Sequence, residues 1–139
     1  MAQPQRKAFD RPDETGQIDK GRVDVVQFAD STVMRTTFEP GWRWSECVRP
    51  VVGGESCQVD HFGYCISGRL HIQMNNGEEL DVGPGDVLRI PPGHDGWVVG
   101  AEPYVGVDFT APPSTPDQVA DRSPARAPAP APATYPPGM

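Results

Sequence analysis

The stretch "GPGDVLRIPPGHDGWVV", residues 83–99, decides the fold of this chain. A glycine-proline turn opens it, the apolar run VLRI follows, and the turn PPGHDG leads into the strand-like run WVVG. Gly85 and Gly93 suit tight turns between strands, and Pro91 suits a strand edge where no amide donor is required. The stretch therefore predicts two short strands separated by a turn that carries His94.

Alternation of apolar and polar residues continues over most of residues 23–110. Further strands are predicted over VDVVQFA, TVMRTTFEP, WRWSECV, CQVDHFGYCISG and YVGVDF. Asn75-Asn76-Gly77 supplies residues that tolerate positive φ, which predicts a tight hairpin between RLHIQM and EELDV. We expect no helix. About eight short strands with closely spaced turns predict an all-β sandwich or barrel.

The two ends of the chain differ from this core in composition. Residues 1–22 mix both charge signs without periodicity, so we expect a flexible arm, anchored at most through Phe9 and Ile18. Residues 111–139 consist mostly of Pro, Ala and small polar residues, which predicts a disordered tail. The chain of 139 residues is thus expected to hold one domain, residues 23–110, between two tails.

The charge of the core limits its partners. The net charge is −7, and residues 23–110 carry thirteen Asp and Glu against five Arg and no Lys. Such a surface disfavours nucleic acid and anionic membranes, which both bind clustered basic residues. The start of the chain has no signal-like pattern and no apolar run is long enough to span a bilayer, so we expect a cytoplasmic protein. Three cysteines without a CxxC pair fit a reducing compartment.

The glycine-proline frame resembles a known family signature. Gly85, five residues, Pro91, one residue and Gly93 are similar to the second signature of the cupin superfamily, and the segment ending at Gly68 is similar to the first. The resemblance extends from about Gly41 to Phe109. It implies a cupin-type double-stranded β-helix, which is a conical jelly-roll barrel, and it also implies a homodimer.

The metal ligands of that family are displaced in this chain. His61 stands where metal-binding cupins have a glutamate, Glu55 and Cys57 stand where they have two histidines, and Gly96 stands at the position of the last histidine. In an extended strand Glu55, Cys57 and His61 would share one face, and His94 would reach them from its turn. Thiolate and imidazole suit Zn²⁺ or Fe²⁺ better than Mg²⁺ or Ca²⁺. We therefore expect one divalent metal (Fe, Zn or Mn) on Cys57, His61 and His94.

The same residues also have simpler interpretations. Cys57 would serve equally as a small buried apolar residue, and His61 as an interior histidine bonded to the backbone. His94 and Asp95 would stabilise their turn by local hydrogen bonds. His71 lies between Leu70 and Ile72 and is expected on the outer face of its sheet.

The aromatic residues suggest a ligand site at the mouth of the barrel. Trp44, Tyr64 and Trp97 are the candidate ligand-binding residues, although large aromatic residues also fill barrel interiors. Glu46 and Glu55 are weak candidates for moving a proton. Phosphate-binding glycine loops and nucleophile-elbow motifs do not occur in the sequence.

Three functions remain open from the sequence. The first is a small cupin-domain protein that binds a metal ion, a small organic ligand or both in the barrel mouth, without established catalysis. The second is a metal-dependent cupin enzyme (a dioxygenase, isomerase or lyase) acting on a small carboxylate or aromatic substrate. The third is a regulatory protein whose proline-rich tail docks on a partner.

Overall fold

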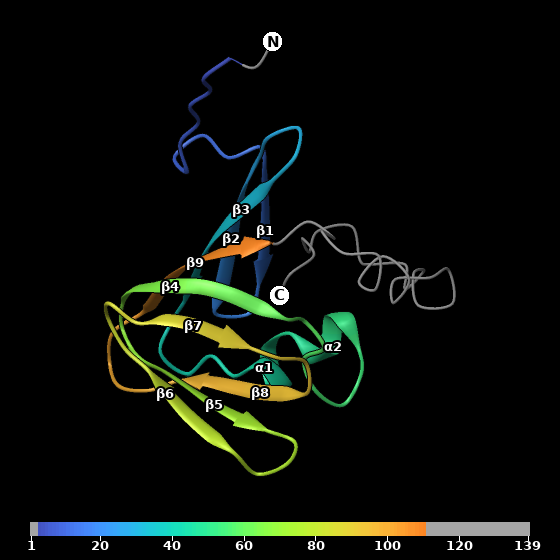
Figure 1. Cartoon of the computed structure of the whole chain (residues 1–139). Coiled ribbons are helices and arrows are strands. Elements are labelled where there is room, and N and C mark those ends of the chain that lie inside the picture. The colour runs from blue at the N-terminus through green and yellow to red at the C-terminus, as the bar shows by residue number, and fades with distance from the viewer. Residues whose placement is uncertain (1–2, 111–139) are drawn as a thin grey trace.

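The computed structural model describes residues 3–110, so the expected tail at 111–139 lies outside the described residues. Figure 1 shows strands arranged in two layers. The elements in chain order are β1 (Glu14–Ile18), β2 (Gly21–Gln27), β3 (Thr32–Phe38), α1 (Trp44–Cys47), α2 (Arg49–Val52), β4 (His61–Ser67), β5 (Leu70–Met74), β6 (Glu79–Val82), β7 (Val87–Ile90), β8 (His94–Val98) and β9 (Tyr104–Thr110).

The strands form two antiparallel sheets that enclose one core. The larger sheet has the order β1-β2-β3-β9-β4-β7 and the smaller has the order β6-β5-β8. In Figure 1, β4 and β7 lie on one side of the core, and β5, β6 and β8 lie on the other. Alternate residues are buried in β3, β4 and β8, as in His94, Gly96 and Val98 of β8. The all-β architecture predicted from the sequence is confirmed.

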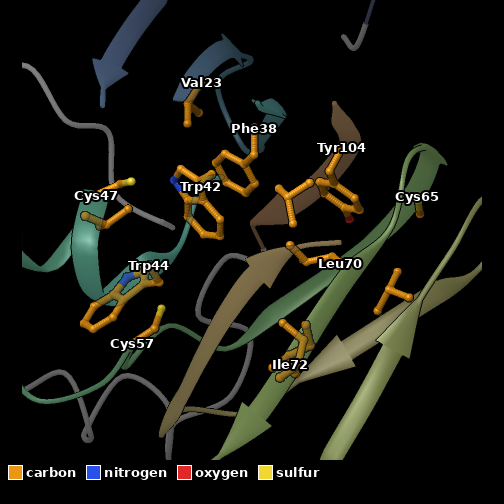
Figure 2. Packing of buried hydrophobic residues seen from close by; sticks show 14 of the residues in the cluster. Val23, Phe38, Trp42, Trp44, Cys47, Cys57, Cys65, Leu70, Ile72 and Tyr104 are labelled. Atoms are coloured by element: carbon orange, nitrogen blue, oxygen red, sulfur yellow. The ribbon is translucent and has the colours of Figure 1, made fainter. Parts of the chain in front are cut away.

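Apolar side chains from both sheets fill the space between them. Phe38 of β3 stacks on Trp42, with ring centroids 3.8 Å apart and planes 4° apart, and this pair can be followed in Figure 2. Leu70 and Ile72 of β5 are buried on the facing sheet. Burial of such side chains supplies the main stabilisation of the fold, at about 1.5–3 kcal/mol each.

The predicted turns are present. Gly77 closes the β5–β6 hairpin at φ +94°, with Leu70 paired to Val82. Gly85 and Gly93 have φ values of +91° and +97°, which glycine adopts at little cost. The Gly85 amide also donates to the carbonyl of Cys65 at 2.9 Å, so this turn is held against β4.

The strand predicted over WRWSECV is wrong, because the helix α1 occupies Trp44–Cys47 and α2 follows directly after this stretch. Trp44, Cys47 and Val48 are buried, and Glu46 is exposed. Buried positions separated by three and four residues match a helical turn rather than a strand. Neither helix of the described chain has the length and apolar character needed to cross a membrane.

The larger sheet begins earlier than the sequence suggested. Strand β1 lies inside the segment expected to be a flexible arm, and it pairs with β2 from Glu14 to Ile18. Ile18 packs against the core, and the guanidinium of Arg35 lies 5.2 Å from the ring centre of Phe9. Both expected anchoring residues therefore make contacts. The segment is attached to the barrel mainly by the pairing of β1 with β2, which the sequence did not predict.

Candidate metal centre

Three side chains of metal-binding type converge inside the barrel. One ligand atom each from Cys57, His61 and His94 lies within 4.8 Å of the others. The Sγ of Cys57 is 3.6 Å from Nε2 of His61, and the centres of the two imidazole rings are 5.2 Å apart. The three residues chosen from the sequence as metal ligands are therefore neighbours in space.

Backbone pairing brings these residues together. The Cys57 amide donates to the carbonyl of His94 at 2.7 Å, and the Gly93 amide donates to the carbonyl of Cys57 at 2.7 Å. This isolated bridge joins the segment before β4 to the start of β8. His61 is the first residue of β4. The long strand predicted from Cys57 is thus interrupted before His61.

His94 belongs to a strand rather than to the turn predicted for it. It is the first residue of β8 and only 4% exposed. Because Gly96 and Val98 on the same strand are buried, the alternation of β8 directs His94 inward. Its side chain therefore faces the core, whereas a position in a turn would not have fixed the direction of the side chain.

Each histidine is oriented by a hydrogen-bond acceptor at Nδ1. Nδ1 of His61 is 2.7 Å from Oδ2 of Asp108, and Nδ1 of His94 is 2.8 Å from the carbonyl of Pro91. Since a carboxylate and a carbonyl only accept, both Nδ1 atoms donate, so Nε2 is the ring nitrogen of each histidine that would bind a metal, with release of any proton it carries. Histidine ligands in metal sites are held in this way. The arrangement therefore fits a divalent metal.

The electrostatics of the cluster favour the metal-binding form of the cysteine. Burial would raise the pKa of the Cys57 thiol, but hydrogen bonds and charge from His61 and His94 lower that pKa to about 6. For His61, burial lowers the pKa, while Asp108 and Cys57 raise it to about 10. A thiolate is thus present at neutral pH, and the thiolate is the form that ligates metals.

A pocket adjoins the three residues. It holds about 570 Å³ of space free of protein atoms, the outer part open to solvent. Its walls come from both sheets and from the segment around α1, and they include Phe38, Trp42, Trp44, Ile72 and Tyr104. Of the three aromatic residues chosen from the sequence as ligand contacts, Trp44 lines this pocket.

The structure places the other two outside the pocket. Tyr64 is 43% exposed, because the inward positions of β4 are His61, Gly63 and Cys65. Trp97 lies on the outer face of β8, between its inward-facing neighbours Gly96 and Val98. The simple alternation of each strand directs both side chains away from the ligands.

Trp97 takes part in a different cluster on that outer face. The guanidinium of Arg43 lies 4.1 Å from its ring centre and the imidazole of His71 lies 4.7 Å from it. Asp95 pairs with Arg43 at 3.3 Å. The expectation that His71 faces outward is confirmed, since Leu70 and Ile72 beside it are buried.

The carboxylate in the site is one that the sequence reasoning missed. Glu46 and Glu55, the two proton-moving candidates, are exposed and do not line the pocket. Asp108 lines it and contacts His61. A signal was available, because Asp108 falls on the same face of β9 as the buried Tyr104 and Gly106.

Comparisons with known proteins agree with this architecture. Residues 54–105 match the family model described as "Cupin domain". None of the curated proteins matches the chain. The family match covers the three candidate ligands and the signature glycines.

Several solved structures share the fold. An uncharacterized conserved protein with a double-stranded β-helix domain from Klebsiella pneumoniae has a TM-score of 0.52 and 22% identity, over 79% of this chain and 91% of that one. A protein of unknown function from Rhizobium leguminosarum has a TM-score of 0.52 and 20% identity, over 67% of this chain and 82% of that one. A DUF1255 protein of unknown function from Acidithiobacillus ferrooxidans has a TM-score of 0.51 and 18% identity, over 72% of this chain and 88% of that one. The match of residues 54–105 to the Cupin domain model and the architecture shared with these structures together show a double-stranded β-helix fold.

Proposed function

We propose that the protein binds one divalent metal ion through Cys57, His61 and His94 and presents it to a small organic molecule in the adjoining pocket. The observation that carries this proposal is the orientation of the two imidazoles. Asp108 and the Pro91 carbonyl accept hydrogen bonds from the Nδ1–H groups, and three ligand atoms lie within 4.8 Å of one another. An interior histidine needs a hydrogen-bond partner in any case, and it is the combination of these partners with three converging ligand atoms that favours a metal centre.

The donor set favours particular metals. One thiolate and two imidazoles suit Zn²⁺ or Fe²⁺, whereas Mn²⁺ prefers carboxylate and water oxygens. Three protein ligands are the number found in catalytic zinc sites, which keep a position for an outside molecule. A bound metal would supply Lewis-acid polarisation of that molecule. The chain's own residues would hold the metal and enclose the ligand.

A metal-dependent enzyme is the second candidate, favoured by Asp108. This carboxylate lines the pocket and bonds to His61, so it is placed to hold a ligand histidine as charge develops in the pocket. The exposed Glu46 and Glu55 do not have such a position. The aromatic wall suits the aromatic class of substrate better than the carboxylate class.

The metal content of the purified protein tests the proposal. We expect about one equivalent of Zn or Fe in wild-type protein prepared without chelator, and loss of that metal in His61→Ala and in His94→Ala. His71→Ala is the matched control, because His71 lies on the outer face of the smaller sheet. A folded wild-type protein that contains no metal and takes up none from added Zn²⁺ would contradict the proposal.

A further inference from the structure

We infer that the pocket beside Cys57, His61 and His94 takes an uncharged, flat and largely apolar molecule that offers one neutral nitrogen or oxygen atom to the metal. This inference rests on the proposed function, because the donor atom needs a metal. It adds the chemical class of the ligand, which is argued below from charge, shape and hydrogen-bonding capacity.

The charges around the pocket disfavour an anionic ligand. Among the described residues that line it, none is Arg or Lys. The charge of a divalent ion would be balanced by the thiolate of Cys57 and the carboxylate of Asp108, so an anion would gain no net attraction. It would still lose its hydration on entering an apolar pocket. A phosphate or carboxylate group is therefore unfavourable here.

The arginine nearest in sequence to the pocket tryptophans does not change this balance. Arg43 lies between Trp42 and Trp44, but its guanidinium stacks on Trp97 and pairs with Asp95. That cluster is on the outer face of β8, and neither Arg43 nor Trp97 lines the pocket. Tyr104 does line it, and burial raises the pKa of Tyr104, which keeps its hydroxyl neutral.

The shape of the walls favours a flat ligand. Phe38 stacks on Trp42 with planes 4° apart, and the ring of Tyr104 lies 6.0 Å from Phe38 with planes 16° apart. Three aromatic rings of the pocket wall therefore lie in nearly one orientation, and the ring of Phe38 is covered on one face by Trp42 (Figure 2). Aromatic rings pack best on planar partners.

Two buried donors add a hydrogen-bonding requirement. The indole N–H groups of Trp42 and Trp44 are buried and have no acceptor within residues 3–110. Both tryptophans line the pocket. A buried donor without an acceptor costs about 1–3 kcal/mol, so a neutral acceptor on a ligand would be favoured over a pure hydrocarbon wherever it reaches one of these groups.

Calorimetric titration of the zinc-loaded full chain with three probes tests the inference. The probes are imidazole (a neutral donor alone), 4-phenylimidazole (the same donor with a flat apolar body) and 4-(imidazolyl)benzoate (the same body with a charge). We expect 4-phenylimidazole to bind about 10- to 100-fold more tightly than imidazole, from burial of its phenyl ring. We expect the benzoate to lose most of that gain. Equal binding of the first two probes, or tightest binding of the benzoate, would overturn the inference.

Two variants on strand β7 test whether the preference for an uncharged probe arises in this pocket. Leu88 of β7 lines the pocket and is half-buried, whereas Val87 beside it is 69% exposed on the other face. Leu88→Arg should shift the preference toward the benzoate by tenfold or more, and Val87→Arg should leave the order of the probes as in the wild type. An unchanged order in a folded, zinc-loaded Leu88→Arg protein would contradict this location.

The zinc content of each sample separates the two proposals. If the wild type does not retain zinc, the proposed function fails and the inference fails with it. If zinc is retained but the phenyl ring brings no gain, the inference alone fails. The wild-type titration decides this even if Leu88→Arg does not fold.

Discussion

At the scale of single residues, Asp108 fixes the orientation of His61. Its Oδ2 accepts from Nδ1 of His61 at 2.7 Å, and loss of such a carboxylate partner typically weakens metal affinity about 10- to 100-fold. We predict a loss in this range for Asp108→Asn, measured by competition with a chelator of known affinity. Asp81→Asn is the control, because it removes an equivalent contact of 2.6 Å from His71. Equal effects of the two substitutions would argue against a role of Asp108 in the metal centre.

His71 gives the outer face of the smaller sheet a pH-dependent stability. Its Nδ1 lies 2.6 Å from Asp81 and its Nε2 lies 2.7 Å from Glu79, so both nitrogens donate only when the ring is charged. The hydrogen bond to Asp81 raises the pKa of His71, burial lowers it, and Glu79 raises it further, with a net increase above 6.5.

The sign of the effect follows from that increase. A folded pKa above the unfolded one stabilises the protein fully below about pH 6.5, and this contribution is lost as the pH rises through the folded pKa. We predict that His71→Gln lowers the free energy of unfolding by up to about 1 kcal/mol at pH 6 and by less in alkaline solution. Urea unfolding of the wild type and of His71→Gln, at pH 6 and in alkaline solution, measures this difference in the free energy of unfolding. A difference that stays constant with pH would mean that only packing on Trp97 is lost.

At the scale of elements, Gly68 is the tightest point between β4 and β5. It has φ +80°, and a Cβ there would lie 2.2 Å from the carbonyl oxygen of Pro103 and 2.6 Å from Cα of Tyr104. Gly77 has φ +94°, but a Cβ there would meet nothing within 4 Å. The two glycines therefore separate the cost of the conformation from the cost of crowding.

We predict that Gly68→Ala destabilises the protein much more than Gly77→Ala. The left-handed conformation alone costs roughly 1–2 kcal/mol, which is the effect expected at Gly77. Crowding of backbone atoms adds about 1–3 kcal/mol at Gly68. Thermal unfolding of both variants measures the difference. Similar melting temperatures of the two variants would show that the backbone at Pro103 and Tyr104 moves away from the added Cβ at little cost.

The elements differ in how well the sequence predicted them. The β5–β6 hairpin and the turns at Gly85 and Gly93 were predictable, because local turn chemistry sets them. The helix α1 was not, since Trp42 and Trp44 are two residues apart and match strand alternation, and a helix of four residues is too short to show a helical period. Strand β1 was missed because it carries little apolar periodicity and its place depends on pairing with β2.

The candidate site was predictable only in part, for a related reason. Cys57, His61 and His94 were chosen by residue type near the family signatures, and the structure brings them together. Asp108 comes from β9, 47 residues after His61, and only the pairing of β4 with β9 makes it a neighbour. Tyr64 was chosen without a register for β4, and a shift of one residue moves a side chain to the opposite face of a sheet.

At the scale of the whole molecule, an apolar strip covers the outer face of the larger sheet near its edge. Phe62, Tyr64, Ile66, Val87 and Phe109 are all exposed, and they come from β4, β7 and β9. In the described chain β7 is the last strand of its sheet, so its outer edge carries backbone groups open to pairing. Exposed apolar patches of this kind mark interaction sites.

We predict that a second copy of the chain covers this strip. The expected result is a mass by light scattering of about twice 15.1 kDa. Tyr64→Glu should shift the population to monomer, because a charge would replace an apolar contact, while Glu79→Gln on the smaller sheet should leave it unchanged. A monomeric wild type at high concentration would contradict the homodimer.

The convergence of Cys57, His61 and His94 on one metal ion is the central claim, and cobalt titration tests it most directly. Co²⁺ replaces zinc in such sites, and a thiolate ligand gives a charge-transfer band in the near ultraviolet. We predict this band at one equivalent in the wild type, its retention in Cys65→Ser and its loss in Cys57→Ser. Cys65 is also buried, so it controls for thiol content. A band that persists in folded Cys57→Ser, or no band in the wild type, would contradict the claim.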